Sequence, residues 1–181
     1  MPDLATTNLL AGIGTILLNI GAIKLLVAYF WEKGWWPEWI RTQAYRWGLW
    51  MAFVLTLGAS IVTLYYSEFL GQAPCGLCWM QRAFLYPQVI LFGVALLHKD
   101  TKIALYSIAL STVGAVIALY QHYLQMGGYD FFPCPATGSA ADCGVRTFFE
   151  YGYITFPFMA FSLFVFLILL MLAMRKAEGK N

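Results

Sequence analysis

The four cysteines of this chain form two pairs whose spacing suits thiol–disulfide chemistry. Cys75 and Cys78, called here the CxxC pair, lie in the sequence PCGLC at the mouth of an apolar segment. Cys134 and Cys143, called here the loop pair, lie in a polar stretch between two further apolar segments. In such chemistry a thiolate attacks a disulfide sulfur, so neighbouring pairs can pass electrons to one another. We predict that all four cysteines are catalytic.

The CxxC pair is predicted to lie at the N-terminus of a helix, because Pro74 disfavours helical conformation in the residue before it. Unpaired N–H groups and the helix dipole favour a thiolate at such a position. A disulfide that closes a loop of about 15 residues contributes about 3 kcal/mol, and the shorter CxxC ring contributes less. The spacing therefore predicts a redox role for this pair rather than a stabilising one.

Arg82 follows Cys78 by four residues, one turn deeper on the same helix face. A permanent cation within a membrane helix is costly and is usually functional. Arg82 is therefore predicted to stabilise the Cys78 thiolate or to bind an oxygen of an electron acceptor. The alternative is that its long side chain reaches out to lipid phosphates at the membrane surface.

The loop pair lies in a segment, about 125–153, that is long for a compact bundle and rich in glycine and proline. Pro133 and Pro135 flank Cys134 and restrict its backbone, which favours docking to a partner protein. The alternative is a disulfide that only shortens the loop. The stretch 145–151 is predicted to form a short interfacial helix. No metal site is predicted, because tetrahedral zinc takes four ligands and this cysteine spacing is unsuitable.

The composition places most of the chain in a lipid bilayer. Only 11% of the 181 residues are charged and 61% are hydrophobic, whereas a soluble domain carries about 25% charged residues. Apolar runs long enough to cross a membrane lie at roughly 7–29, 46–69, 80–97, 103–124 and 154–174. The first is too long for a signal peptide and lacks a basic start, so we expect it in the mature protein.

These segments predict an all-α membrane protein in two parts. Residues 1–44 hold an additional N-terminal transmembrane helix and a basic loop, and residues 45–181 form a four-helix transmembrane bundle. Small residues at Ser107, Ser111 and Ala115 share one helix face, which favours close helix packing.

The basic residues predict the orientation, since Lys and Arg gather on the cytoplasmic side of membrane proteins. Arg82 and Arg146 lie on the side of the cysteines, and eight of the eleven basic residues lie on the opposite side. Those eight are Lys33, Arg41, Arg46, Lys99, Lys102, Arg175, Lys176 and Lys180. The N-terminus is therefore expected outside a bacterial inner membrane, with both cysteine pairs extracytoplasmic, where disulfides persist. Scattered basic residues and a net charge of +2 argue against a nucleic-acid partner.

His122 lies near the outer end of the segment 103–124, at a depth similar to that expected for Arg82. No haem, flavin or iron–sulfur motif is evident in the sequence, so a membrane quinone is the expected electron acceptor. His122 and Arg82 are predicted to hydrogen-bond the quinone oxygens or to supply a proton. The alternative for His122 is an ordinary interfacial histidine near a helix end.

The segment from about 45 to 174 resembles the DsbB/BdbC family of disulfide-formation proteins. The resemblance rests on PCGLC followed by Arg82, on Tyr120-Gln121-His122, and on a second cysteine pair before the last helix. It implies an enzyme that reoxidises a DsbA-like thioredoxin-fold thiol oxidase and reduces a quinone, either ubiquinone or menaquinone.

The same resemblance implies a role for each site residue. Cys78 is expected to meet the quinone ring, Cys75 to exchange with the loop pair, and Cys134 to form the mixed disulfide with the partner. Arg82 and His122 are expected to line the quinone site. The chain departs from the family pattern in its extra helix, in its closely spaced loop pair, and in a glutamine before the histidine, where an acidic residue is sometimes found.

We therefore predict a membrane thiol:quinone oxidoreductase. One alternative is a small membrane scaffold or transporter subunit with two structural disulfides. Another is a quinone reductase that runs the chemistry in reverse, as in proteins similar to vitamin K epoxide reductase. The scaffold differs from the prediction in that its CxxC pair does not turn over, and the reverse reductase differs in the direction of electron transfer.

Overall fold

The computed structural model describes residues 4–31, 37–131, 134 and 143–178. Lys33, Pro133, Pro135 and Lys180, named above, lie outside these ranges. The protein is an all-helical, multi-pass membrane protein, and within the described ranges five helices are long and apolar enough to cross a bilayer. The predicted fold class is therefore confirmed.

The helices match the five predicted spans in number and order, with differences at their ends. They are α1 (Leu4–Trp31), α2 (Glu38–Leu64), a π-helix η1 (Tyr65–Phe69) that continues α2, α3 (Gly76–His98), α4 (Ile103–Gln125) and α5 (Phe156–Glu178). The largest difference is at α2, which begins at Glu38 rather than 46, so Arg41 and Arg46 are helical. Pro37 lies at its N-cap, where the missing proline N–H costs no helical hydrogen bond.

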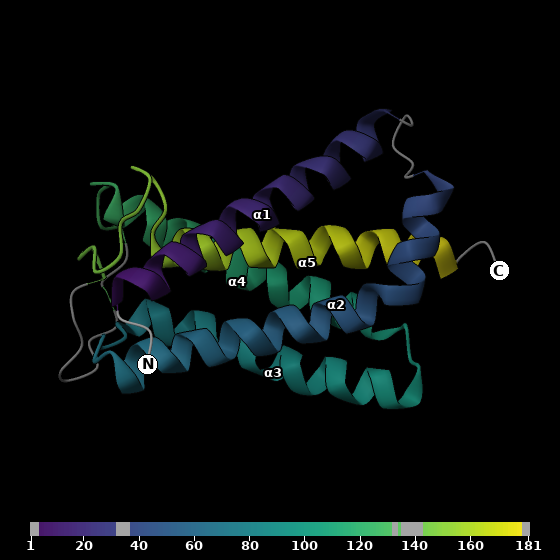
Figure 1. Ribbon diagram of the computed structural model, residues 1–181, viewed down its shortest axis with the longest axis horizontal. Coiled ribbons are helices and arrows are strands. Elements are labelled where there is room, and N and C mark those ends of the chain that lie inside the picture. Colours follow the sequence, from purple (N-terminus) through teal and green to yellow (C-terminus); the bar gives the residue numbers. More distant parts are fainter. Residues whose placement is uncertain (1–3, 32–36, 132–133, 135–142, 179–181) are drawn as a thin grey trace.

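The last helix, α5, lies at the centre of the bundle. α4, α2 and α1 all pack against it, and α1 crosses it obliquely (Figure 1). α5 is apolar on nearly every side, which favours a position enclosed by other helices. Its fully buried residues include Phe164, Leu167, Met171 and Met174.

α4 approaches α5 closely because Gly114 has no side chain. A Cβ atom at this position would lie 2.5 Å from Cζ of the buried Phe164 ring. Gly114→Ala is therefore expected to lower the free energy of unfolding by about 1–3 kcal/mol, the usual cost of overpacking a core. Thermal unfolding in detergent measures this loss. Gly58→Ala is the matched control, because a Cβ atom there would meet no atom within 4 Å apart from its chain neighbours and the adjacent backbone of its own helix; equal midpoints for the two variants would contradict the prediction.

The predicted small-residue face of α4 is buried and also carries a polar contact with α3. Ser107 and Ser111 donate hydrogen bonds of 2.7 and 3.2 Å to Oε1 of Gln88. Nε2 of Gln88 donates in turn to the carbonyl oxygen of Phe84 at 3.0 Å. These bonds satisfy a fully buried amide next to Pro87, where the helix lacks a backbone donor.

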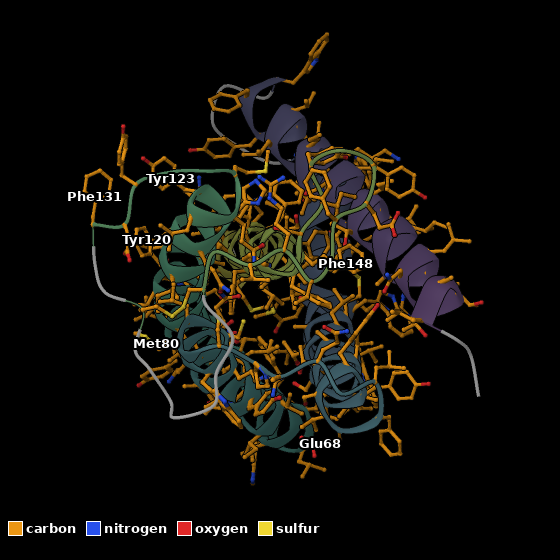
Figure 2. The ribbon with its side chains drawn as sticks, turned by 90° about the vertical axis from the view of Figure 1, so that its left-hand side faces the viewer. Glu68, Met80, Tyr120, Tyr123, Phe131 and Phe148 are labelled. Atoms are coloured by element: carbon orange, nitrogen blue, oxygen red, sulfur yellow. A yellow bond between two sulfur atoms is a disulfide. The ribbon has the colours of Figure 1, made fainter. Side chains whose placement is uncertain are left out.

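One end of the bundle holds the end of η1, the starts of α3 and α5, the end of α4 and the loop between α4 and α5 (Figure 1). We call it the cysteine end. Figure 2 looks onto this end and shows Phe148 toward the middle of the bundle and Phe131 at its rim. The additional helix α1 reaches the same end, where Asn8 Oδ1 accepts a 2.7 Å hydrogen bond from the Tyr66 hydroxyl. The Tyr66 ring packs edge-on against Phe148 and Phe156, so α1 is tied to the loop.

Candidate active site

The CxxC pair lies at the N-terminus of α3, as the sequence predicts. Cys75 is the N-cap residue, and its sulfur accepts a 3.4 Å hydrogen bond from the backbone N–H of Cys78. The two sulfur atoms are 3.0 Å apart and not bonded to each other. Cys75 is only 4% exposed, whereas Cys78 is partly exposed.

The two thiols of the CxxC pair are not equivalent. The hydrogen bond with the Cys78 side chain and then burial raise the pKa of Cys75 well above its usual range. Cys75 therefore stays protonated at neutral pH. When one sulfur of the pair carries a negative charge, that sulfur is Cys78.

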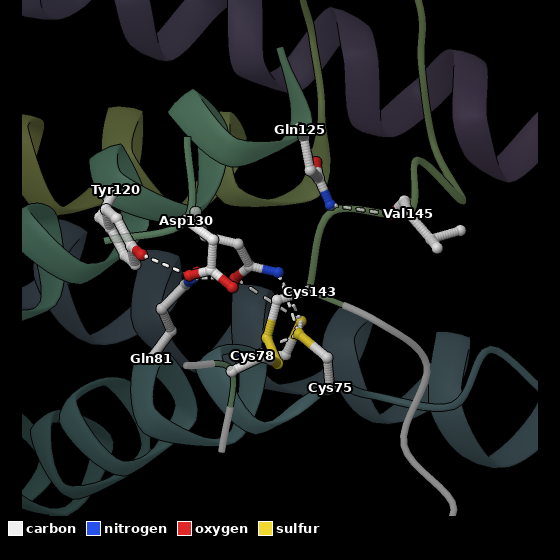
Figure 3. The surroundings of a disulfide bond; sticks show 10 residues. Cys75, Cys78, Gln81, Tyr120, Gln125, Asp130, Cys143 and Val145 are labelled. Atoms are coloured by element: carbon white, nitrogen blue, oxygen red, sulfur yellow. Dashed lines mark hydrogen bonds between the residues drawn. A yellow bond between two sulfur atoms is a disulfide. The ribbon is translucent and has the colours of Figure 1, made fainter. Parts of the chain in front are cut away.

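Gln121 on α4 contacts both sulfurs of the CxxC pair. Its Nε2 atom donates to Cys75 Sγ at 3.0 Å and to Cys78 Sγ at 3.3 Å (Figure 3). Its Oε1 atom accepts a 2.6 Å hydrogen bond from Nε2 of Gln81, and both glutamines are buried. Sequence reasoning noted Gln121 only as a departure from a family pattern and missed this contact.

The loop pair is joined by a disulfide and packs directly against the CxxC pair. Cys134 and Cys143 have Cα atoms 5.9 Å apart. Cys143 is 1% exposed, and Cys134 is partly exposed. One apolar cluster contains all four cysteines together with Leu77, Ile117, Tyr120 and Leu124. Figure 3 shows Cys143 beside Cys75 and Cys78. The two pairs, far apart in sequence, thus occupy one site.

The chain after Cys143 is held against the end of α4 by polar contacts. Nε of Arg146 donates to the carbonyl oxygen of Gln125, and Nε2 of Gln125 donates to the carbonyl of Val145 at 3.1 Å. The Tyr120 hydroxyl donates to Asp130 Oδ1 at 3.0 Å and fixes the other side of the loop.

The interfacial helix predicted for 145–151 is wrong. The segment forms no helix and runs into a tight turn closed by an antiparallel bridge between Glu150 and Ile154. Phe148 is buried against Tyr66 and Phe156, and Gly152 supplies a positive φ of 78° in the turn. Burial of one aromatic anchor and this turn together fix the segment in a non-helical path.

Arg82 points into the bundle rather than out to the membrane surface. The residue is 8% exposed, and its Nη2 atom donates to the carbonyl oxygen of Thr63 on α2 at 2.9 Å. Its guanidinium carbon lies 5.2 Å from the centre of the Trp79 ring. The first turns of α3 therefore hold a buried cation close to the CxxC pair.

His122 faces a different neighbour from the one expected. Its Nδ1 atom is 2.9 Å from Oγ1 of Thr155, immediately before α5, and its ring centre is 5.1 Å from that of Phe158. Within the described part of the chain, no hydrogen bond joins His122 to Arg82. A joint role for the two residues remains a prediction.

The fold and the site together define a class: helical membrane proteins with two adjacent cysteine pairs at one end of the bundle. The chain belongs to the DsbB family of disulfide-forming oxidoreductases, since the family model "Disulfide bond formation protein DsbB" matches residues 45–174. Membership implies a part in membrane disulfide generation. α1 lies outside the matched residues.

Curated relatives agree with this assignment. "Probable disulfide formation protein C 1" of Bacillus anthracis is 38% identical over 66% of this chain and 81% of its own length. "Disulfide bond formation protein C" of Bacillus subtilis is 32% identical over 73% of this chain and 95% of its own length. "Probable disulfide formation protein" of Metapseudomonas resinovorans is 30% identical over 70% and 88%. No solved structure matches the chain significantly.

Proposed function

We propose that the protein is a membrane protein-dithiol:quinone oxidoreductase. It would reoxidise an extracytoplasmic, DsbA-like thioredoxin-fold thiol oxidase and pass the electrons to a membrane quinone. The observation that carries the proposal is the single apolar cluster that contains both the CxxC pair and the loop pair. Sulfur atoms gathered in this way can exchange disulfides without a large movement of the chain.

Electrons enter at the loop pair. A thiolate of the reduced partner attacks Cys134, the more exposed sulfur of that disulfide, and forms a mixed disulfide. Cys143 leaves as a thiolate. The second partner thiol then attacks the mixed disulfide, so the partner ends oxidised and the loop pair ends as a dithiol.

The loop pair then reduces an oxidised CxxC pair. Cys143 is buried in the same cluster as Cys75, so its thiolate attacks Cys75 and displaces the Cys78 thiolate. Cys134 closes the loop disulfide again and releases Cys75 as a thiol. Two electrons have then moved from the loop pair to the CxxC pair, which holds one thiol and one thiolate.

The final acceptor would be a quinone, either ubiquinone or menaquinone, bound as a substrate. It would take up two protons and the two electrons of the CxxC dithiol, which would return to a disulfide. Arg82 suits an acceptor oxygen, because within the described residues its guanidinium makes one hydrogen bond and has further N–H groups to donate. His122 is the second residue proposed for this site. Its imidazole can hold or release a proton there.

The placement in the membrane is also part of the proposal. The N-terminus would lie outside a bacterial inner membrane, the C-terminus in the cytoplasm, and the cysteine end outside. Residues 45–181 would form the catalytic four-helix bundle, with 1–44 as an accessory helix and loop. Disulfides persist in such a compartment, as the proposed role of the loop pair requires.

Purified protein mixed with a reduced thioredoxin-fold donor and a soluble quinone tests the proposal. We expect quinone absorbance to fall and donor disulfide to appear in equal amounts. A scaffold with two structural disulfides would leave both reagents unchanged. An enzyme that runs the chemistry in reverse would instead oxidise added quinol and reduce the disulfide of an oxidised thioredoxin-fold partner.

Arg82→Gln tests whether the buried cation serves turnover or stability. Loss of a charged hydrogen bond to the acceptor is expected to lower kcat/KM for quinone by roughly 10- to 100-fold. Transfer from the donor to the loop pair should be unaffected, because that step precedes the acceptor. Arg82→Lys keeps the charge and should retain more activity. A variant that loses thermal stability but turns over normally would favour the scaffold alternative.

A further inference from the structure

We propose that Gln121 is a catalytic residue, an uncharged donor of hydrogen bonds that stabilises the reduced form of the CxxC pair. The inference rests on the proposed function, because it concerns how that same pair accepts electrons. By stabilising the reduced CxxC pair, Gln121 makes electron transfer from the loop pair to the CxxC pair favourable.

The position of the Gln121 amide carries the inference. Its Nε2 atom lies within hydrogen-bond distance of both reacting sulfurs, at 3.0 and 3.3 Å. An amide nitrogen has two hydrogens to donate and accepts none, so each contact with a thiolate is attractive. Gln121 is 1% exposed and Cys75 is 4% exposed, so water competes little for the Gln121 amide and for the Cys75 sulfur.

Gln81 fixes which end of the Gln121 amide meets the sulfurs. Nε2 of Gln81 donates at 2.6 Å to Oε1 of Gln121, which leaves Nε2 of Gln121 as the amide atom nearer to the CxxC pair; Oε1 lies 3.8 Å from Cys78 Sγ. A flipped Gln121 amide would set donor against donor at Gln81 and its own oxygen against the sulfurs. Gln81 is thus a positioning residue.

The charge balance of the exchange explains why an uncharged donor matters. Reduction of the CxxC disulfide by the loop dithiol yields the loop disulfide, one CxxC thiol, one CxxC thiolate and one released proton. The new negative charge appears in a largely buried cluster, where a thiolate needs donors. A carboxylate at position 121 would oppose that charge, whereas an amide supports it.

A pair whose reduced form is stabilised becomes the stronger oxidant. Within the described residues, no side-chain hydrogen bond reaches either sulfur of the loop pair. The Gln121 contacts therefore bias electrons from the loop pair toward the CxxC pair. This bias gives the transfer its direction.

The test is the redox equilibrium of the CxxC pair with glutathione, measured in full-length protein whose loop cysteines are both serine. Hydrogen bonds to a charged group contribute enough that Gln121→Leu should shift the equilibrium constant about tenfold or more toward the disulfide. Gln81→Leu should shift it in the same direction by less. Thr112→Val, at an exposed position on the same helix, should leave it unchanged.

Gln121→Glu separates chemistry from packing, because glutamate has nearly the same shape. We expect a shift toward the disulfide that grows as pH rises and the carboxyl loses its proton. A purely structural role predicts a wild-type equilibrium without added pH dependence, and that result would overturn the inference. The assay contains neither quinone nor partner. Wild-type protein that fails to reduce quinone would therefore reject the proposed function, while unchanged equilibria in the Gln121 variants would reject this inference alone.

Discussion

Cys78→Ser is expected to reduce quinone turnover to the uncatalysed background while the protein still inserts and folds. In the proposed route Cys78 is the last sulfur before the acceptor, and a serine hydroxyl cannot take its place in a disulfide. The side chain is partly exposed at the first turn of α3, so the exchange of sulfur for oxygen disturbs little packing. Quinone absorbance with a reduced protein donor, and separately with a small dithiol, measures the loss.

The same variant also tests the order in which electrons pass through the loop pair and the CxxC pair. It keeps the loop pair, so it should oxidise about one equivalent of donor dithiol per protein and then stop. Acid quenching followed by alkylation counts the oxidised donor. Thr112→Val, which faces away from the site, should retain wild-type turnover. Normal turnover by Cys78→Ser would contradict the route, and no donor oxidation at all would contradict entry through the loop pair.

Much of this architecture can be predicted from the sequence, because bilayer physics leaves few choices. Runs of apolar residues indicate the membrane helices, and their order brings the start of α3 and the loop after α4 to the same end of the bundle. Pro74 correctly predicts a helix start at the CxxC pair. The burial of Arg82 agrees with the prediction of a functional cation and disfavours a side chain that reaches out to lipid phosphates.

The side-chain contacts of the site could not be predicted, because they depend on how each helix is rotated about its own axis. Gln121 and His122 are adjacent, so their side chains leave α4 about 100° apart. Only the rotation of α4 decides which one meets the CxxC pair. The structure turns Gln121 toward the sulfurs and His122 toward Thr155. The wrong prediction of a helix at 145–151 has a similar cause, because the burial of Phe148 depends on tertiary packing.

Serine at either position of the loop pair is expected to abolish oxidation of the protein donor and to spare quinone reduction driven by a small dithiol. The reason is that a small dithiol can reach the partly exposed Cys78 directly, whereas a protein donor needs the accessible Cys134. The two assays run side by side measure this separation. Loss of both activities in these variants would show that the loop pair also shapes the CxxC site.

The two loop variants should differ in one further reaction. The probe is a single-cysteine donor activated as a mixed disulfide with a nitrothiobenzoate group. An accessible thiolate attacks the donor's sulfur, forms a disulfide between the two proteins and releases the coloured nitrothiobenzoate thiolate. With the CxxC pair held oxidised, Cys143→Ser leaves Cys134 available and should form this adduct roughly tenfold faster than Cys134→Ser, in which only the buried Cys143 of the loop pair remains. Non-reducing gels and the released colour measure both rates. Equal rates would mean that burial of Cys143 does not choose the point of attack, and the assignment of Cys134 as the entry sulfur would fall.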